Sequence, residues 1–376
     1  MKILLKRPVW AEINLQAIKN NVLEIRKIVD KKRIMAIIKA NAYGHGSVEI
    51  AKTLIEEGID FFGVAILEEA LELRRKGFTE DILILGWLPP ENYQESLENN
   101  IIICIYDFEE AKILEEMGKK LGIKARVHLK IDTGMTRIGF LPSEKSLLEI
   151  LTIMKYKNII VEGIFSHFSK ADEKDKSYAN LQLKKFKGFV EEIEKNSGKT
   201  ILWKHIANSA SILDFPSSHF NMVRAGIILY GLEPSEEVGF KDKNFLPALS
   251  LKAKLSRVAE ISSKTLVSYG GIFETGKASK IGTIPIGYAD GYTRLLTGKG
   301  KVLIKGKKKD IIGKICMDQC MVDLSEVTDI KKGDEVILLG GGIAGESADD
   351  LAKKIGTINY EIVCMFSDRI PKIYKE

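Results

Sequence analysis

The sequence of 376 residues is poor in cysteine and offers no recognisable metal-binding pattern. It has four cysteines, at Cys104, Cys316, Cys320 and Cys364. Cys316 and Cys320 are close enough to suggest a metal site, but no histidine or second cysteine pair has a suitable spacing. We therefore expect reduced, structural thiols and no bound metal.

Long apolar runs are also missing. No segment approaches the length needed to cross a membrane, and the start, residues 1–10, lacks the apolar core of a signal peptide. These two absences predict a cytoplasmic protein without a membrane partner.

Concentrated charge is the third absence. The formal net charge is +6, but the basic residues are spread along the chain. The longest basic run, Lys305–Lys309, is interrupted by Gly306 and is typical of a solvated hairpin tip. We therefore expect no nucleic-acid partner. A mild positive excess suits anionic ligands such as phosphates and carboxylates.

What is present is an alternation of short apolar runs with polar, helix-like segments, such as 50–57, 68–76, 108–120 and 180–195. The apolar runs are 34–38, 61–66, 82–85, 101–105, 127–131, 161–165, 203–206 and 222–229. Eight strands alternating with helices in about 240 residues predict an α/β fold, a (β/α)8 TIM-type barrel. A doubly wound sheet is the main alternative and usually has fewer strands.

The pattern changes after Gly239, where strand-like runs dominate. They are 249–258, 280–286, 301–304, 311–322, 335–339 and 362–366, with one helix expected at 347–355. We therefore predict two domains, a barrel over 1–240 and a smaller, mostly-β domain over 241–376. The polar segment 234–244 is the expected boundary.

The first barrel strand ends in Lys39, and barrel enzymes place their active sites at the carboxyl ends of the strands. Burying an ammonium is costly, so a lysine here either reaches solvent at the barrel mouth or is kept partly neutral by its site. A neutral lysine can form an imine with an aldehyde cofactor.

Other strand ends are polar as well. They carry Lys130, Asp132, Arg137, Ser166, His167, Asn208, Ser209, Arg224 and Gly226. Taken singly, His167 could be a core histidine, Asn208 a turn residue and Arg224 half of a surface ion pair. Repeated at the same end of successive strands, they are hard to explain as packing and indicate one site.

Nine motifs in this order resemble the alanine racemase family over essentially the whole chain. They are 9–15 (VWAEINL), 36–46 (AIIKANAYGHG), 131–139 (IDTGMTRIG), 205–209 (HIANS), 223–227 (VRAGI), 267–270 (VSYG), 286–291 (IGYADG), 313–319 (GKICMDQ) and 359–361 (NYE). The resemblance implies a racemase that uses pyridoxal 5'-phosphate (PLP) to interconvert L- and D-alanine. It also implies a supply of D-alanine for peptidoglycan and a homodimer with shared active sites.

The resemblance assigns Lys39 as the residue that holds PLP in a Schiff base and as the base on one face of alanine. Tyr269 matches the second base, which the family takes from the partner subunit's β domain. Two bases on opposite faces are what racemisation requires. An isolated Tyr269 between glycines could otherwise be a turn aromatic.

The remaining site residues are also carried over from the family. Arg224 matches the arginine that faces the pyridine nitrogen; because arginine keeps its proton, this choice favours racemisation over transamination. His205 supports Arg224, His167 packs on the ring, Arg137 and the Met317 backbone receive the substrate carboxylate, and Tyr288 narrows the entrance. Lys130 matches a lysine that is carbamylated in some members. The phosphate would be held by Tyr43, Asn208, Ser209, Gly226, Ile227 and Tyr360.

Four alternatives are less consistent with the sequence. A non-catalytic PLP carrier would lack the second domain, and in a PLP decarboxylase Arg137 would hold the carboxylate that must leave. A broad-specificity racemase for larger amino acids is typically exported, whereas no export signal is present here. Gly340, Gly342 and Gly345 fit a dinucleotide-binding pattern, but β-rich surroundings do not supply the βαβ unit that it requires.

Overall fold

The structure, a computed structural model, describes residues 7–240, 242–340 and 345–376. The chain divides into two compact units. The barrel unit comprises residues 18–42 and 47–246. The β unit comprises residues up to 17, residues 43–46 and the chain from 247 onward. The segment 43–46, directly after the first barrel strand, therefore belongs to the β unit.

The barrel unit contains eight parallel strands in the order β8-β7-β6-β5-β4-β3-β2-β9. They are β2 (Arg33–Ile37), β3 (Phe61–Val64), β4 (Asp81–Ile84), β5 (Ile102–Ile105), β6 (Ala125–Lys130), β7 (Ile159–Phe165), β8 (Trp203–His205) and β9 (Met222–Ala225). The edges approach each other beyond β8, where the Arg224 amide donates to the Ala207 carbonyl at 3.1 Å. The predicted TIM-type barrel is confirmed.

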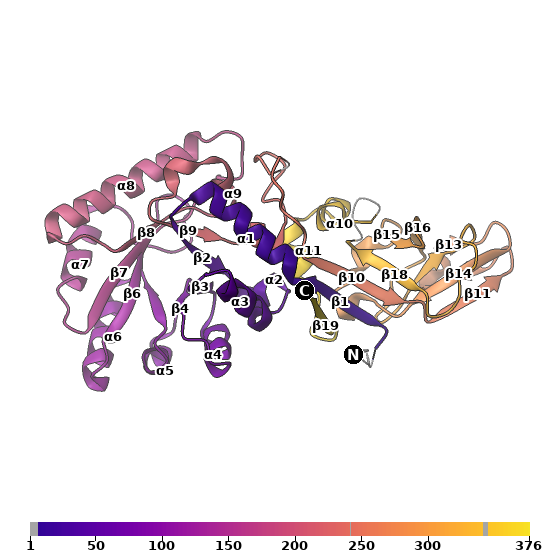
Figure 1. Cartoon of the computed structure of the whole chain (residues 1–376), viewed down its shortest axis with the longest axis horizontal. Coiled ribbons are helices and arrows are strands. Elements are labelled where there is room, and N and C mark those ends of the chain that lie inside the picture. The colour runs from indigo at the N-terminus through magenta and orange to yellow at the C-terminus, as the bar shows by residue number, and fades with distance from the viewer. Residues whose placement is uncertain (1–6, 241, 341–344) are drawn as a thin grey trace. The chain divides into compact units, whose positions relative to one another are not determined.

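Helices flank these strands (Figure 1). They are α1 (Leu15–Val29), α3 (Ser47–Glu56), α4 (Leu67–Arg75), α5 (Tyr93–Glu98), α6 (Phe108–Leu121), α7 (Glu144–Ile153), α8 (Ser177–Ser197) and α9 (Ser209–Asp214), with 3-10 turns η1 (Pro90–Asn92), η2 (Pro216–Ser218) and η3 (Ile227–Tyr230). Local chemistry explains their ends: Asp107 accepts the amides of Glu109 and Glu110 to begin α6, and Gly122 ends that helix at φ 68°. The four helices predicted before residue 200 are present as α3, α4, α6 and α8.

The β unit is built on one nine-stranded sheet, in the order β11-β14-β17-β16-β15-β18-β10-β1-β19. Its strands are β1 (Val9–Asn14), β10 (Leu249–Lys254), β11 (Arg257–Ile261), β14 (Ser279–Ile284), β15 (Lys301–Ile304), β16 (Lys307–Ile312), β17 (Cys320–Asp323), β18 (Glu335–Leu339) and β19 (Lys372–Lys375). A separate hairpin pairs β12 (Leu266–Val267) with β13 (Phe273–Glu274). The remaining elements are η4 (Tyr269–Gly271), η5 (Tyr288–Asp290), η6 (Arg294–Leu296), α10 (Ala348–Ile355) and α11 (Asn359–Cys364).

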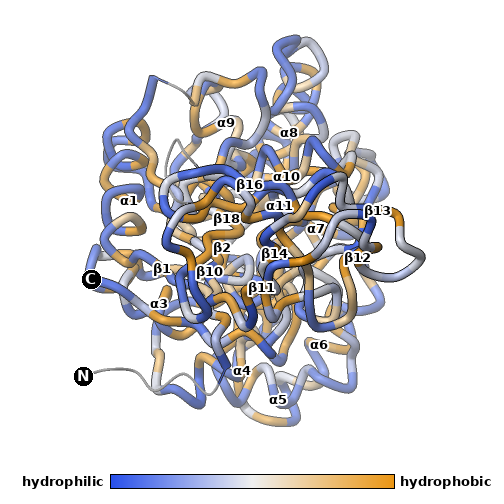
Figure 2. Tube along the Cα trace, turned by 90° about the vertical axis from the view of Figure 1, so that its right-hand side faces the viewer, coloured by the Kyte–Doolittle hydropathy of each residue, from blue (hydrophilic) through white to orange (hydrophobic). Residues whose placement is uncertain are grey.

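The basic run at 305–309 forms the turn between β15 and β16. Lys305 and Gly306 both have positive φ, 47° and 76°, as the central residues of a type I′ turn require. Both are exposed. Figure 2 shows the hydrophilic colour of β16 and the more hydrophobic colour of β18, from which β15 separates it in the sheet. The hairpin tip predicted from the sequence is confirmed.

Three predicted β-domain elements need correction. The run 362–366 is not a strand, because α11 occupies 359–364; a five-residue apolar run cannot be assigned from periodicity alone. The run 249–258 divides into β10 and β11, and the run 311–322 into β16 and β17. Of the glycine pattern at 340–345, residues 341–344 lie outside the described residues.

Candidate active site

Lys39 lies just after β2 and begins an unusual turn. Ala40, Asn41 and Ala42 have φ of 51–54° and ψ of 48–52°, the left-handed helical conformation. L-residues avoid this conformation at a cost of about 1–2 kcal/mol each, so the surrounding structure must hold the turn. Glu69 does so by accepting the Ala40 amide at 2.6 Å, and the Asn41 side chain accepts the Ser47 amide at 2.8 Å. The turn fixes where the chain leaves β2 and hence where Lys39 begins.

Arg224, on β9, is buried at 4% exposure, and its guanidinium makes four hydrogen bonds. Its Nη1 donates to Nδ1 of His205 at 2.9 Å, and its Nη2 donates to Nδ1 of His167 at 2.9 Å. Nη2 also reaches the carbonyls of Ser166 at 2.9 Å and Ile206 at 3.1 Å. Burial, and secondly the charge of Arg137, lower the pKa of Arg224 to about 9. It therefore remains a cation at neutral pH.

Four predicted cations gather around His167. Burial lowers the pKa of His167 well below its ordinary value, and the charges of Arg224, Arg137, Lys130 and Lys39 lower it further. A group of like charges is stable only when an anion balances it. The carboxyl ends of the barrel strands are therefore suited to a ligand that carries phosphate or carboxylate groups.

Lys130, the last residue of β6, is buried at 3% exposure. Its Nζ donates to the carbonyls of Ile131 at 2.9 Å and Ile138 at 3.2 Å. Burial is the main cause that lowers its pKa to about 8. Most of this amine therefore keeps its proton at neutral pH, with roughly one tenth uncharged at pH 7.

The loop that carries Arg137 is shaped by Asp132. One carboxylate oxygen of Asp132 accepts the amides of Gly134, Met135 and Thr136 at 2.9–3.1 Å. Asp132 is buried, whereas Arg137 at the end of the loop is exposed. The loop is thus rigid at its base and presents the guanidinium outward.

The residues assigned to the phosphate lie in two groups. In the barrel unit, the Gly226 amide donates to the Ser209 hydroxyl at 3.0 Å, Asn208 caps α9, and Ile227 begins η3. In the β unit, the rings of Tyr43 and Tyr360 lie 6.2 Å apart. Burial raises the pKa of Tyr43, so its hydroxyl keeps its proton and can donate a hydrogen bond.

Tyr269, Met317 and Tyr288 are brought together within the β unit. Tyr269 is 71% exposed on the short η4 turn, where Ser268 has φ 65°. Tyr269 lines a hollow of about 790 Å³ together with Cys316. The Tyr288 amide donates to the Cys316 carbonyl at 3.1 Å, and the Ala289 amide to the Met317 carbonyl at 3.0 Å. The segment 316–317 therefore connects the turn that carries Tyr288 to the hollow that Tyr269 and Cys316 line.

Buried His128 and partly exposed Glu162 connect to the arginine site through His205 but were not among the sequence-based assignments. His128 contacts His205, and Glu162 contacts His128. A signal for His128 was present, because Arg126, His128 and Lys130 alternate along β6 and so share one face. Glu162 lacked such a signal, since the register between β6 and β7 shifts next to His128.

Metal-binding clusters and membrane-spanning helices are both absent from the part of the chain that the structure describes. Across the residues that the structure describes, no three His, Cys, Asp or Glu side chains are grouped to hold a metal ion. No described helix combines the length and apolar character that a membrane span requires.

Comparison with known proteins gives matches over nearly the whole chain. Residues 13–234 match the model of the alanine racemase N-terminal domain, and residues 248–374 match that of the C-terminal domain. The alanine racemase of Clostridium perfringens (strain SM101) is 52% identical over 98% of this chain and 96% of its own.

Solved structures agree with these matches. The alanine racemase of Clostridium difficile 630 superposes with a TM-score of 0.96 at 44% identity, covering 99% of this chain and 97% of its own. That of Bacillus anthracis, with bound L-Ala-P, gives 0.93 at 36% identity over 100% and 96%. With both domains matched in full-length relatives, the chain belongs to the alanine racemase family.

Proposed function

We propose that this chain interconverts L- and D-alanine with PLP, using Lys39 and Tyr269 as its two bases. One observation carries the proposal: the charge of Lys39 acts on His167 together with that of Arg224, and Arg224 is held by His167 and His205. Family membership supplies the reaction, and a relative that binds L-Ala-P supports a ligand of this size and charge.

The barrel residues fit the proposed cofactor. Lys39 offers an amine for the aldehyde, and Ser209 and Gly226 lie where the phosphate is assigned. Together with Asn208, Ile227, Tyr43 and Tyr360, they would hold the phosphate; His167 would pack on the ring. When bound, PLP supplies an electron sink that makes the α-hydrogen of alanine acidic.

Arg224 sets which reaction follows. Its guanidinium has only donors and stays protonated at neutral pH, so it can hydrogen-bond the ring nitrogen without giving up a proton. A ring that is not protonated withdraws electrons less strongly. We infer that Arg224 thereby favours return of the proton to the α-carbon, which is racemisation, over transamination.

The proton would move between the two bases and the α-carbon. Lys39 would remove or return it on one face and Tyr269 on the other, while Arg137 and the Met317 amide hold the carboxylate in place. Tyr288 would narrow the entrance. The β domain supplies Tyr269, and we propose that it does so to the site of a second copy. The 71% exposure of Tyr269 supports this, since it leaves the phenol open to a partner.

We also place the protein in the cytoplasm, where its product would serve peptidoglycan synthesis. The thiols of Cys104, Cys316 and Cys320, which form no disulfide among the described residues, support a reducing compartment.

The test of this function uses two inactive variants. Borohydride reduction followed by peptide mapping should label Lys39 in the wild type, and Lys39→Ala should lose the label and nearly all racemisation. Tyr269→Phe should slow both directions and impair α-proton exchange on one face only.

Co-expression of Lys39→Ala and Tyr269→Phe chains with different tags should restore activity in the purified hybrid dimer, since one of its two sites contains both wild-type bases. A verified hybrid as inactive as its parents would contradict the shared site. A label on another lysine would contradict the role of Lys39.

A further inference from the structure

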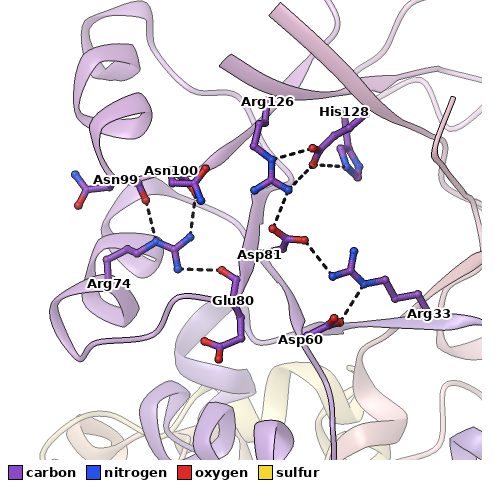
Figure 3. A network of polar contacts seen from close by, with 10 residues as sticks. Arg33, Asp60, Arg74, Glu80, Asp81, Asn99, Asn100, Arg126 and His128 are labelled. Atoms are coloured by element: carbon purple, nitrogen blue, oxygen red, sulfur yellow. Dashed lines mark hydrogen bonds and ion pairs between the residues drawn. The ribbon is translucent and has the colours of Figure 1, made fainter. Parts of the chain in front are cut away.

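A line of polar side chains continues from Arg224 through the interior of the barrel. Beyond His205, Nε2 of that ring lies 2.9 Å from Nδ1 of His128 on β6. Nε2 of His128 lies 3.5 Å from Oε1 of Glu162 on β7, a contact near the outer limit of hydrogen bonding. Arg126 holds this carboxylate through two contacts of 2.8 and 3.1 Å. Arg126 and His128 are labelled in Figure 3.

The two ends of this line together allow one direction for its hydrogens, because Arg224 can only donate and the ionised carboxylate of Glu162 can only accept. A guanidinium can only donate, so Nδ1 of His205 must accept and carries no hydrogen. Neutral His205 then has its hydrogen on Nε2 and donates it to Nδ1 of His128. Neutral His128 in turn has its hydrogen on Nε2, pointing at the carboxylate of Glu162. One tautomer is therefore allowed at each ring.

Packing keeps both rings neutral and in place. His128 and His205 have no exposed surface, and burial lowers the pKa of each. The ring of His205 stacks on Phe165 with centroids 4.9 Å apart. A Cβ at Gly163 would lie 2.4 Å from the His128 ring, so only glycine leaves room for this imidazole.

We propose that Glu162 and His128 are positioning residues that hold Arg224 in its working orientation by fixing the tautomers of His128 and His205. Among the described residues, Nε2 of His128 forms no hydrogen bond of ordinary length, and its contact with the Glu162 carboxylate is 3.5 Å. Without that carboxylate, a buried N–H loses its acceptor. If the hydrogen of His128 moves to Nδ1, His205 must carry one on Nδ1, directly against the N–H of Arg224. Each alternative breaks a contact in the line.

The consequence for catalysis rests on the proposed role of Arg224 beside the cofactor ring. Loss of Glu162 should act on the chemical step rather than on substrate affinity, because neither Glu162 nor His128 is assigned to alanine. Outer residues that orient a reacting group through a histidine typically contribute about 10- to 100-fold. We expect a fall of that size in kcat, with KM changed by less than about threefold.

Histidine NMR tests the line without any turnover. The chain has five histidines, so 15N-histidine labelling gives a spectrum simple enough to assign with single variants. In the wild type, His128 and His205 should each show the Nε2–H tautomer alone. Glu162→Leu, which keeps the volume but accepts no hydrogen bond, should give mixed or shifted ring signals for both. Glu162→Gln keeps an acceptor oxygen and should restore the single tautomer and most of kcat.

Asp81→Leu is the matched control. Asp81 is the other carboxylate partner of Arg126, at 2.8 Å, but it is not part of the series Arg224, His205, His128 and Glu162. This variant should lower the thermal midpoint as Glu162→Leu does, yet keep the wild-type ring signals and kcat within about threefold. Unchanged ring signals in Glu162→Leu, or an equal loss of kcat in Asp81→Leu, would overturn the proposal. A wild type with the expected tautomers but no racemisation would instead contradict the proposed function.

Discussion

Charged side chains are arranged differently at the two ends of the barrel strands: they form ion pairs at the amino ends, and cations cluster at the carboxyl ends. At the amino ends, Arg33 contacts Asp60 and Asp81 at 3.0 Å, and Arg126 contacts Asp81 and Glu162 at 2.8 Å. Figure 3 shows these ion pairs as one connected network. At the carboxyl ends, four cations face His167. Charges that are paired within the fold serve stability, whereas an excess of one sign indicates where a ligand supplies the other.

Backbone strain follows the same division. Before the strands, left-handed φ occurs at Asp30, Asn100 and several glycines, which tolerate it, with Phe220 as the exception. After the strands, positive φ occurs at Asn41 and several glycines as well, but also at Ala40, Ala42, Tyr43 and Thr136, which tolerate it poorly. The carboxyl ends therefore concentrate both unbalanced charge and unfavourable backbone, as functional sites commonly do.

Replacing Arg224 with glutamate should have the largest effect, because it reverses the central charge of the cationic end. Racemisation should fall by about 100-fold or more, and the fraction of turnovers that end in pyruvate should rise. Coupled assays for D-alanine and pyruvate measure both. Unchanged racemisation without added pyruvate would count against the role of Arg224.

Lys130 should make the stability of the cationic end depend on pH. Its pKa is about 8 when folded and about 10.4 when unfolded, so between these values the unfolded chain binds more protons and stability rises with pH. Lys130→Met removes this slope. The stability advantage of Lys130→Met over the wild type should shrink by roughly 3 kcal/mol between pH 7 and 10.5. Urea unfolding in CO2-free buffer tests this; parallel curves would mean that the amine is not desolvated.

Arg33→Met should weaken the paired end without touching the reaction. Arg33 makes two ion pairs and lies over the rings of Phe61 and Trp203 at 4.8 and 4.7 Å. Their loss should lower the free energy of unfolding by about 1–2 kcal/mol, since each contact is partly exposed. Denaturant unfolding of Arg33→Met measures the free energy of unfolding, and racemisation kinetics of the same variant measure kcat. A large fall in kcat at unchanged stability would break the separation between the two ends.

How far the sequence predicts this molecule depends on the range of the contacts involved. All eight barrel strands were predicted, because each contains a short run of mostly apolar, largely buried residues; the predicted run 222–229 continues past β9 into η3. The pairing of β1 with β10 and β19 spans more than 200 residues, and no local pattern indicates it. The left-handed turn after Lys39 contains no glycine until Gly44, so propensity alone opposes it. The line of polar side chains from Arg224 to Glu162 likewise comes from four strands and only becomes visible in three dimensions.

Ala40→Gly should have the smallest effect and measures the strain directly. Ala40 is exposed and left-handed, so glycine removes about 1–2 kcal/mol of steric cost but adds about 0.5–1 kcal/mol of unfolded-chain entropy. The net result should be a gain of about 0.5–1 kcal/mol in the free energy of unfolding. Gly122→Ala is the matched reverse change at the amino end, since φ there is 68° and nothing lies within 4 Å of an added Cβ. It should cost about as much as Ala40→Gly gains. If Ala40→Gly destabilises the chain while Gly122→Ala behaves as expected, the turn after Lys39 is not strained, and only the difference in charge would distinguish the two ends.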